Sequence, residues 1–138
     1  MANVVTIFIP SKRSSVRIAR YALKSFLAVN DVPEDIAIDS EIALGEALSN
    51  VIIHTYRDFE GGRIIVSYLL KDDELRIVIR DFGPPVNKEN LRLIPPDPEN
   101  PRTGGYGLYI IQSLVDHWEV KNLKDGNLTL LVKRVRCR

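Results

Sequence analysis

The order of apolar and polar residues divides the first part of the chain into one strand-like and two helix-like stretches. The β-branched run VVTIFI, residues 4–9, ends at a proline and predicts a strand. Over residues 11–29, apolar residues recur every three or four positions, which predicts an amphipathic helix. A second helix is expected from Pro33 to about Tyr56, either unbroken or restarted at Asp39, whose side chain could cap it. The predicted buried side of the first helix consists of Val16, Ala19, Leu23, Phe26 and Leu27.

The second part of the chain predicts a hairpin, a long loop, a helix and another hairpin. Residues 61–83, GGRIIVSYLLKDDELRIVIRDFG, contain two β-rich runs on either side of a turn at 71–74. The pattern breaks over residues 83–105, which are rich in proline. A loop of more than about 15 residues in a compact domain is usually a lid, a binding loop or disordered. Residues 107–118 then have helical spacing, and a turn at 125–126 separates two final strands.

This order of elements, β-α-α-β-β-loop-α-β-β, predicts the fold class. Helices and strands in this order indicate an α+β protein built as a two-layer sandwich. We expect a mixed, mostly antiparallel sheet with the helices on one face. The length of 138 residues suits a single domain that spans residues 1–138.

Composition and charge narrow the function classes. Hydrophobic residues make up 45% and charged residues 27%, which is an ordinary balance for a globular protein. The formal net charge of +1 gives no reason to expect a nucleic acid or an anionic membrane as a partner. The apolar runs are too short for a membrane span and the N-terminus lacks a signal-peptide layout, so we expect a cytoplasmic protein. The single cysteine excludes a disulfide framework.

The tripeptide Asp81-Phe82-Gly83 raises the question of a kinase, because protein kinases of the eukaryotic type bind magnesium through the same three letters. That fold needs a chain roughly twice as long, together with a glycine-rich loop and an H-R-D-L-x-x-x-N segment that this sequence lacks. The tripeptide is therefore either a simple turn or part of a different nucleotide site.

A polar stripe on the second helix offers candidate chemistry. Glu46, Asn50 and His54 follow one another at intervals of four and lie on one side of a helix. The stripe is either a solvated helix face or a carboxylate and an amide directed into a nucleotide pocket, where they could act as base and magnesium ligand. The opposite side, predicted to be the core side, consists of Leu44, Ala47, Leu48, Val51, Ile52 and Thr55.

A glycine segment, TGGYGLYIIQSLVD, opens the third predicted helix with Gly104, Gly105 and Gly107. Glycines let the backbone approach a ligand closely, and a helix N-terminus offers free N–H groups that suit phosphate. The segment matches neither the Walker A nor the dinucleotide pattern. It is either a phosphate-binding turn or a flexible hinge that ends the proline-rich loop.

Three signals now stand in a fixed order: Glu-x-x-x-Asn on a helix, Asp-x-Gly at the end of a strand, and Gly-x-Gly-Leu after a long loop. This order resembles the GHKL, or Bergerat-fold, ATPases, which have a histidine-kinase-like ATPase domain. The stretches EIALGEALSNVIIHTY, LRIVIRDFGPPV, GGYGLYIIQSLVDHWEV and GNLTLLVKRV resemble the branch of small bacterial anti-sigma-factor serine/threonine kinases. The resemblance covers nearly the whole chain.

The resemblance implies ATP and Mg²⁺ as cofactors and assigns roles along the helix and the strands. Glu46 would be the catalytic base, Asn50 would coordinate magnesium, and His54 would lie near the phosphates. Asp81 would accept a hydrogen bond from the adenine amino group, and Thr129 on the last strand would share in adenine recognition.

The resemblance also assigns the glycines and the loop between them. Gly83 would let the base lie against the backbone, and residues 84–104 would form the ATP lid. In this sequence Pro85 stands where the family's D-x-G-x-G box usually has its second glycine, and two adjacent prolines fix φ and remove two N–H donors. The segment expected to wrap the phosphates consists of Gly104, Gly105, Tyr106, Gly107 and Leu108.

The implied function is that of a protein kinase and anti-sigma factor, which phosphorylates a small antagonist protein, sequesters a sigma factor and forms a homodimer. On the first helix, Arg13, Arg17, Arg20 and Lys24 form a basic ridge that is either a solvated face or a docking face. The resemblance implies a partner-facing role for Arg17 and Arg20. Two alternatives stay open: a module that sequesters a partner without kinase activity, and a catalytic fragment that works with a separate histidine-containing protein.

Overall fold

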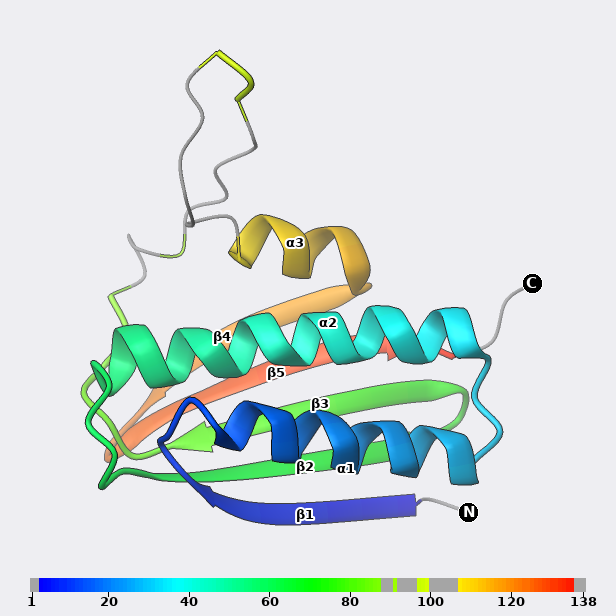
Figure 1. The fold of residues 1–138 in the computed structure, drawn as a ribbon, viewed down its shortest axis with the longest axis horizontal. Coiled ribbons are helices and arrows are strands. Elements are labelled where there is room, and N and C mark those ends of the chain that lie inside the picture. The colour runs from blue at the N-terminus through cyan, green and yellow to red at the C-terminus, as the bar shows by residue number, and fades with distance from the viewer. Residues whose placement is uncertain (1–2, 88–90, 92–96, 100–106, 136–138) are drawn as a thin grey trace.

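Five strands form one antiparallel sheet, and the helices lie against one of its faces (Figure 1). The computed structural model describes residues 3–87, 91, 97–99 and 107–135. The strands are β1 (Asn3–Pro10), β2 (Arg63–Lys71), β3 (Glu74–Asp81), β4 (His117–Leu123) and β5 (Gly126–Arg134). The helices are α1 (Ser15–Val29), α2 (Glu34–Asn50), a short π-helix η1 (Val51–Thr55) and α3 (Gly107–Leu114).

The sheet has the strand order β1-β2-β3-β5-β4, and each of the four pairings is antiparallel. The predicted α+β sandwich is confirmed, and the described sheet is antiparallel throughout rather than mixed. The pairing of β3 with β5 sets Asp81 opposite Asn127 and Ile79 opposite Thr129. Two polar positions far apart in the sequence therefore lie on neighbouring strands at the same end of the sheet.

The core lies between the sheet and the helices, as the apolar spacing predicts. Side chains alternate along β2 and β3, so every second residue is buried beneath the helices. The Tyr68 hydroxyl donates a 2.7 Å hydrogen bond to the Ala19 carbonyl oxygen, which links β2 to α1. Five of the predicted core positions on the second helix are confirmed as buried hydrophobic residues, and Thr55 is buried with them: Leu44, Ala47, Leu48, Val51 and Ile52.

The second helix differs in two details from the sequence prediction. It does not restart at Asp39: α2 runs unbroken from Glu34 to Asn50, and the Asp39 carboxylate lies 3.5 Å from the Lys133 ammonium. After Asn50 the helix widens into η1, where the Tyr56 N–H donates to the Val51 carbonyl oxygen at 2.9 Å. A π-helical turn has a different period from an α-helix, so the polar stripe follows α-helical spacing only as far as Asn50.

The turns and the third helix follow the predicted pattern with small shifts. Asp72 and Asp73 adopt positive φ values of 52° and 63°, which suits a tight hairpin turn. The third helix ends at Leu114, because the Asp116 N–H already donates to the Val132 carbonyl oxygen at 2.9 Å. In the described part of the chain, no helix combines the length and apolar character needed to cross a membrane.

Candidate functional site

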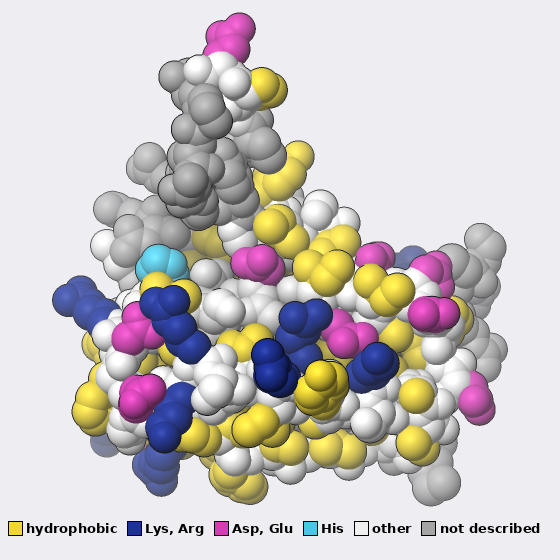
Figure 2. Space-filling model, in the orientation of Figure 1, with side chains coloured by type: hydrophobic (Ala, Val, Ile, Leu, Met, Phe, Trp, Pro, Cys, Tyr) yellow, Lys and Arg dark blue, Asp and Glu magenta, His cyan; other side chains and the backbone are white. Residues whose placement is uncertain are grey.

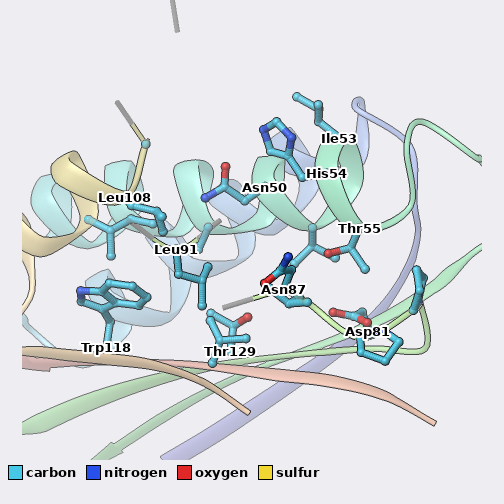
Figure 3. Close-up of a pocket in the computed structure, with 18 of the residues that line it drawn as sticks. Asn50, Ile53, His54, Thr55, Asp81, Asn87, Leu91, Leu108, Trp118 and Thr129 are labelled. Carbon is cyan, nitrogen blue, oxygen red and sulfur yellow. The ribbon is translucent and has the colours of Figure 1, made fainter. Parts of the chain in front are cut away.

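A cavity of about 1050 Å³ lies between the helices and the end of the sheet where β3 stops. Figure 3 shows Asn50 and His54 on the helical wall, and Asp81 and Thr129 on the strands below them. The helix and strand motifs thus line one space, although the sequence separates them. The predicted site residues that line the cavity are Asn50, His54, Asp81, Pro85, Gly107, Leu108 and Thr129.

Asp81, the last residue of β3, lines the cavity and is fully buried. Its Oδ1 accepts hydrogen bonds from the Gly83 N–H at 3.0 Å and from Asn127 Nδ2 at 2.9 Å. Its Oδ2 has no hydrogen-bond partner among the described residues. Burial raises the pKa of the Asp81 carboxyl, and the hydrogen bond from Asn127 opposes that shift. The cavity therefore contains a buried carboxylate oxygen that is able to accept one more N–H donor.

The backbone after Asp81 is fixed by two residues of the second helical segment that sequence reasoning gave no role at the site. A Cβ atom at position 83 would lie 2.6 Å from Thr55 Cγ2, so the close approach to η1 requires glycine. The Tyr56 hydroxyl accepts a 2.8 Å hydrogen bond from the Phe82 N–H and donates one of 2.6 Å to the Arg63 carbonyl oxygen. Gly83 is thus required by its packing against η1, and it does not line the cavity itself.

Asn127 is a further buried residue that the sequence analysis did not include in the site. Its Nδ2 donates to Asp81 Oδ1 and to the Pro84 carbonyl oxygen, each at 2.9 Å. Its Oδ1 accepts a 3.1 Å hydrogen bond from the Val86 N–H. One carboxamide therefore contacts both the buried carboxylate and the start of the loop. The available signal was the strand register, which sets position 127 opposite position 81.

The other end of the cavity is lined by Asn50 and His54 of the polar stripe and by Gly107, the first residue of α3, whereas Glu46 does not line it. A Cβ atom at position 107 would lie 3.0 Å from Glu46 Oε2 and 3.5 Å from Asn50 Oδ1, so Gly107 lies directly against both side chains. Glu46 and Asn50 are partly buried, whereas His54 is exposed at the rim. The helix motif and the glycine motif are thus adjacent. A solvated face for the helix motif and a simple hinge for the glycine motif both fit this contact less well than a shared site does.

An apolar wall completes the cavity beside the polar groups. It is formed mainly by Leu108 and Ile111 of α3, Trp118 of β4 and Leu131 of β5. Figure 3 shows the Trp118 ring next to Leu108, on the side of the cavity away from Asp81. Because Trp118 is the single tryptophan of the chain, its fluorescence can report on binding in this cavity.

Several predicted residues lie elsewhere or cannot be placed. Gly104, Gly105 and Tyr106 lie outside the described residues, as does most of the expected lid at 84–104. Arg17 and Arg20 are exposed on α1 and do not line the cavity. A Cβ atom at position 45 would lie 3.6 Å from Arg20 Cδ, which places the Arg20 side chain against α2. Figure 2 shows basic side chains scattered over this helical face between apolar ones.

The fold and the site define a class of protein, and comparison with known proteins agrees with it. The model of the histidine kinase-like ATPase domain family matches residues 9–133. The chain belongs to this family. The predicted relationship to the GHKL ATPases is thereby confirmed.

Three named relatives show which proteins of this family the chain is similar to. The chain is 30% identical to the serine-protein kinase RsbW of Oceanobacillus iheyensis over 83% of this chain and 76% of the relative. It is 27% identical to RsbW of Listeria monocytogenes over 97% and 88%, respectively. It is also 28% identical to the anti-sigma F factor of Clostridium perfringens over 97% of each chain.

Solved structures share the fold at lower sequence identity. The RsbU and RsbW domains of a Mycobacterium tuberculosis protein give a TM-score of 0.72 at 21% identity, over 96% of this chain and 32% of that longer chain. The catalytic domain of the histidine kinase ThkA gives a TM-score of 0.57 at 13% identity, over 96% of each chain. These likenesses concern the fold alone.

Proposed function

We propose that the cavity binds ATP with Mg²⁺ and that the protein transfers the γ-phosphoryl group to a serine or threonine hydroxyl. The observation that carries the proposal is the buried Asp81 carboxylate, whose Oδ2 has no described partner. A fully buried acceptor is costly unless a donor reaches it, and the amino group of adenine is such a donor. Thr129, two positions beyond Asn127 on β5, supplies a hydroxyl to the same cavity.

The opposite end of the cavity suits the phosphates. The free N–H groups at the start of α3 favour anions, and Gly107 lies against the polar stripe of α2. The Asn50 amide oxygen is a hard ligand of the kind that magnesium prefers. When bound there, Mg²⁺ would neutralise phosphate charge that develops during transfer. His54 lines the cavity at its rim, and we propose that it contacts a phosphate group.

The chemical step requires a base and a fixed geometry. In the proposed reaction the substrate hydroxyl oxygen attacks the γ-phosphorus, the bond from that phosphorus to the β,γ-bridging oxygen breaks, and ADP leaves. Glu46 accepts the hydroxyl proton, because its carboxylate lies on the same helix stripe as Asn50, one turn earlier. Positioning and charge neutralisation supply the rest of the rate enhancement.

The substrate and the partners follow from the relatives. Their names, serine-protein kinase and anti-sigma F factor, support a small antagonist protein as phosphoryl acceptor and a sigma factor as sequestered partner. Phosphorylation would add about −1.5 to −2 charges to the antagonist and weaken a tight interface. Since such partners control transcription, the proposal places the protein in the cytoplasm, without direct contact to nucleic acid or membrane.

Labelled ATP tests the kinase proposal directly. Mixed with Mg²⁺, this protein and candidate antagonists, it should transfer label to a serine or threonine of one of them. The alternative function, a binding module without kinase activity, is favoured by Pro84-Pro85, which removes two N–H donors beside the cavity. ATP binding without label transfer to any antagonist would support that alternative. Absence of ATP binding at millimolar concentration would refute the kinase proposal and would leave a module that sequesters a partner without nucleotide.

Arg17 and Arg20 are proposed to contact the protein partners. Both are exposed on α1, and the alkyl part of Arg20 lies along α2 beside Gly45. This contact limits the freedom of the side chain and leaves its guanidinium at the surface. We expect Arg20→Glu to weaken binding of sigma factor and antagonist while ATP affinity stays unchanged. Unchanged partner binding in a pull-down titration would refute the docking role.

A homodimer is proposed through the sheet face that the described helices leave open (Figure 1). Phe8 of β1 points to this face and is 77% exposed, with Ile65 of β2 as its neighbour across the pair. Burial of such side chains would stabilise association. Phe8→Glu should shift the protein from dimer to monomer in sedimentation. Phe59→Glu, which changes an exposed phenylalanine in the loop before β2, should not.

A further inference from the structure

We infer that Asn127 is a positioning residue for the nucleotide base, which couples the orientation of the Asp81 carboxylate to the wall formed by Pro84 and Val86. The inference rests on the proposed function, because it concerns the same ATP site. It adds a residue for which the motifs gave no role. Its basis is the set of hydrogen bonds made by one buried carboxamide.

Asn127 is fully buried, and all the donors and acceptors of its side chain have partners. Nδ2 carries two N–H groups, which point to Asp81 Oδ1 and to the Pro84 carbonyl oxygen at 2.9 Å each. Oδ1 accepts from the Val86 N–H at 3.1 Å. A buried amide with every group satisfied has one orientation, because flipping it would set its N–H₂ group against the Val86 N–H.

The first consequence concerns the carboxylate. Asn127 and the Gly83 N–H both bind Oδ1, so the carboxylate cannot rotate without losing two hydrogen bonds. Oδ2 is thereby kept as the oxygen without a described partner. Asn127 thus helps to fix the plane of the Asp81 carboxylate, with one oxygen left for a base.

The second consequence concerns the two prolines. Pro84 and Pro85 have no N–H groups, so this segment has few ways to pair with the sheet. The Asn127 carboxamide binds the carbonyl before Pro85 and the N–H after it, as a peptide group of a neighbouring strand would. Pro84, Pro85 and Val86 line the cavity, so this bridging fixes one wall of the site. Where the family has a flexible glycine, this chain has a rigid segment bound by one side chain.

The position of Asn127 also depends on the backbone conformation of Gly126, the residue before it. Gly126 has a φ of 152°, and a Cβ atom there would lie 2.0 Å from the Asp81 carbonyl oxygen. The glycine therefore allows β5 to begin close enough to β3 for the residue that follows it to reach the carboxylate. Gly126 thus allows the close approach of the strands, and Asn127 makes the hydrogen bond to Asp81.

The variant Asn127→Asp tests the inference, because it keeps the shape but replaces the N–H₂ group with an oxygen that faces Asp81. At pH 8 two carboxylates would face each other, and we expect ATP to bind about tenfold more weakly or worse. As the pH falls, the pair would take up one shared proton, which restores a donor between the two groups. ATP affinity of the variant should therefore recover between pH 8 and about pH 6, a change that the wild type does not show.

Base selectivity is the second readout. Inosine triphosphate has an oxo group where ATP has the amino group, so it cannot donate to Oδ2. We expect the wild type to prefer ATP and the variant to lose much of that preference at pH 8. Trp118 fluorescence or calorimetry measures both affinities. A residue with only a structural role would lower the melting temperature and leave the ATP-to-inosine-triphosphate ratio and its pH dependence unchanged.

Asn122→Asp is the matched control. Asn122 pairs with Asn127 across the β4–β5 hairpin and donates to the Val86 carbonyl oxygen at 3.2 Å, but it is exposed and does not contact Asp81. Its ATP affinity should stay within about twofold of the wild type, since exposed hydrogen bonds contribute little. If Asn127→Asp does not fold at pH 8, Asn127→Ser introduces no charge and should also reduce base selectivity.

Two results would overturn the inference while leaving the proposed function intact. One is a folded Asn127→Asp protein that binds ATP as tightly as the wild type at pH 8. The other is equal weakening of ATP and inosine triphosphate with no pH dependence. A wild-type protein that binds no ATP would instead refute the proposed function itself.

Discussion

The two ends of the cavity are built in different ways. At the end that we propose binds the nucleotide base (the base end), Asp81 and Asn127 are fully buried, and their hydrogen bonds fix every polar atom except Asp81 Oδ2. At the end that we propose binds the phosphates (the phosphate end), Glu46 and Asn50 are only partly buried, and His54 is exposed. The base end is held by strand pairing and side-chain hydrogen bonds, whereas the phosphate end is one helix stripe facing the start of another helix.

This difference indicates how binding and catalysis are divided. In the proposed function, a preorganised base end would provide selectivity without rearrangement, because its polar groups are fixed by folding. A partly solvated phosphate end leaves room for metal, phosphate and a substrate hydroxyl to enter. Changes at the base end should therefore affect nucleotide affinity, and changes at the phosphate end should affect phosphoryl transfer.

The largest expected effect is at the phosphate end. Glu46→Gln keeps the size of the side chain but removes the base, so phosphoryl transfer should fall about 100- to 10,000-fold. ATP affinity, followed by Trp118 fluorescence, should stay within about twofold, since the base end is unchanged. Equal losses in affinity and transfer would contradict the division of the two ends.

Asp81→Asn should have the next largest effect and should act on affinity. It places an amide where the base needs an acceptor, so ATP and ADP should both bind at least about tenfold more weakly. The loss should be the same with and without magnesium. A loss seen only with magnesium would mean that Asp81 binds metal, as in the kinases whose tripeptide it shares.

The same variant should be more stable than the wild type at neutral pH. Burial raises the pKa of Asp81 in the folded protein above its unfolded value, so ionisation of this group costs stability as the pH rises through the folded pKa. The neutral amide avoids that cost. The melting temperature of Asp81→Asn should therefore exceed that of the wild type at pH 8, and the difference should shrink toward pH 4. A difference in melting temperature that does not change with pH would contradict this prediction.

Wild-type affinity for ATP should depend on the same ionisation. Protonated Asp81 no longer offers a free carboxylate oxygen, so ATP affinity should decrease as the pH falls below the raised pKa of this group. Asp81→Asn is the control, because any remaining pH dependence in that variant belongs to the phosphates or to other groups. If both proteins show the same pH profile, the base end does not titrate as proposed.

The smallest expected effect is that of Gly107→Ala. The new Cβ would lie 3.0 Å from Glu46 Oε2, and the glutamate side chain can shift by a few tenths of an ångström. We expect a loss of phosphoryl transfer of about three- to tenfold, which corresponds to a small misplacement of the base. Gly45→Ala is the control. A Cβ atom at position 45 would make only ordinary contacts, and alanine in place of glycine inside a helix should stabilise the folded protein by about 1 kcal/mol.

Much of the fold could be predicted because apolar spacing reports directly on burial. The core sides of α1 and α2 and both hairpins follow from local pattern, and the structure changes only their ends. The π-helix at 51–55 could not be predicted, since it depends on how the chain turns toward β2 rather than on residue spacing. For the same reason the position of His54 relative to Asn50 was not determined by helical period.

The family, the order of its motifs and the residue types needed for the proposed chemistry can be read from the sequence, because these depend on neighbours in the chain. The strand pairing is needed to see that one Asp81 oxygen has no described partner and that Asn127 binds the other. These facts depend on the register of β3 with β5, which brings together positions 46 residues apart. Hydrogen bonds across such a pairing leave no local pattern in the sequence, and so they appear only when the strands are in place.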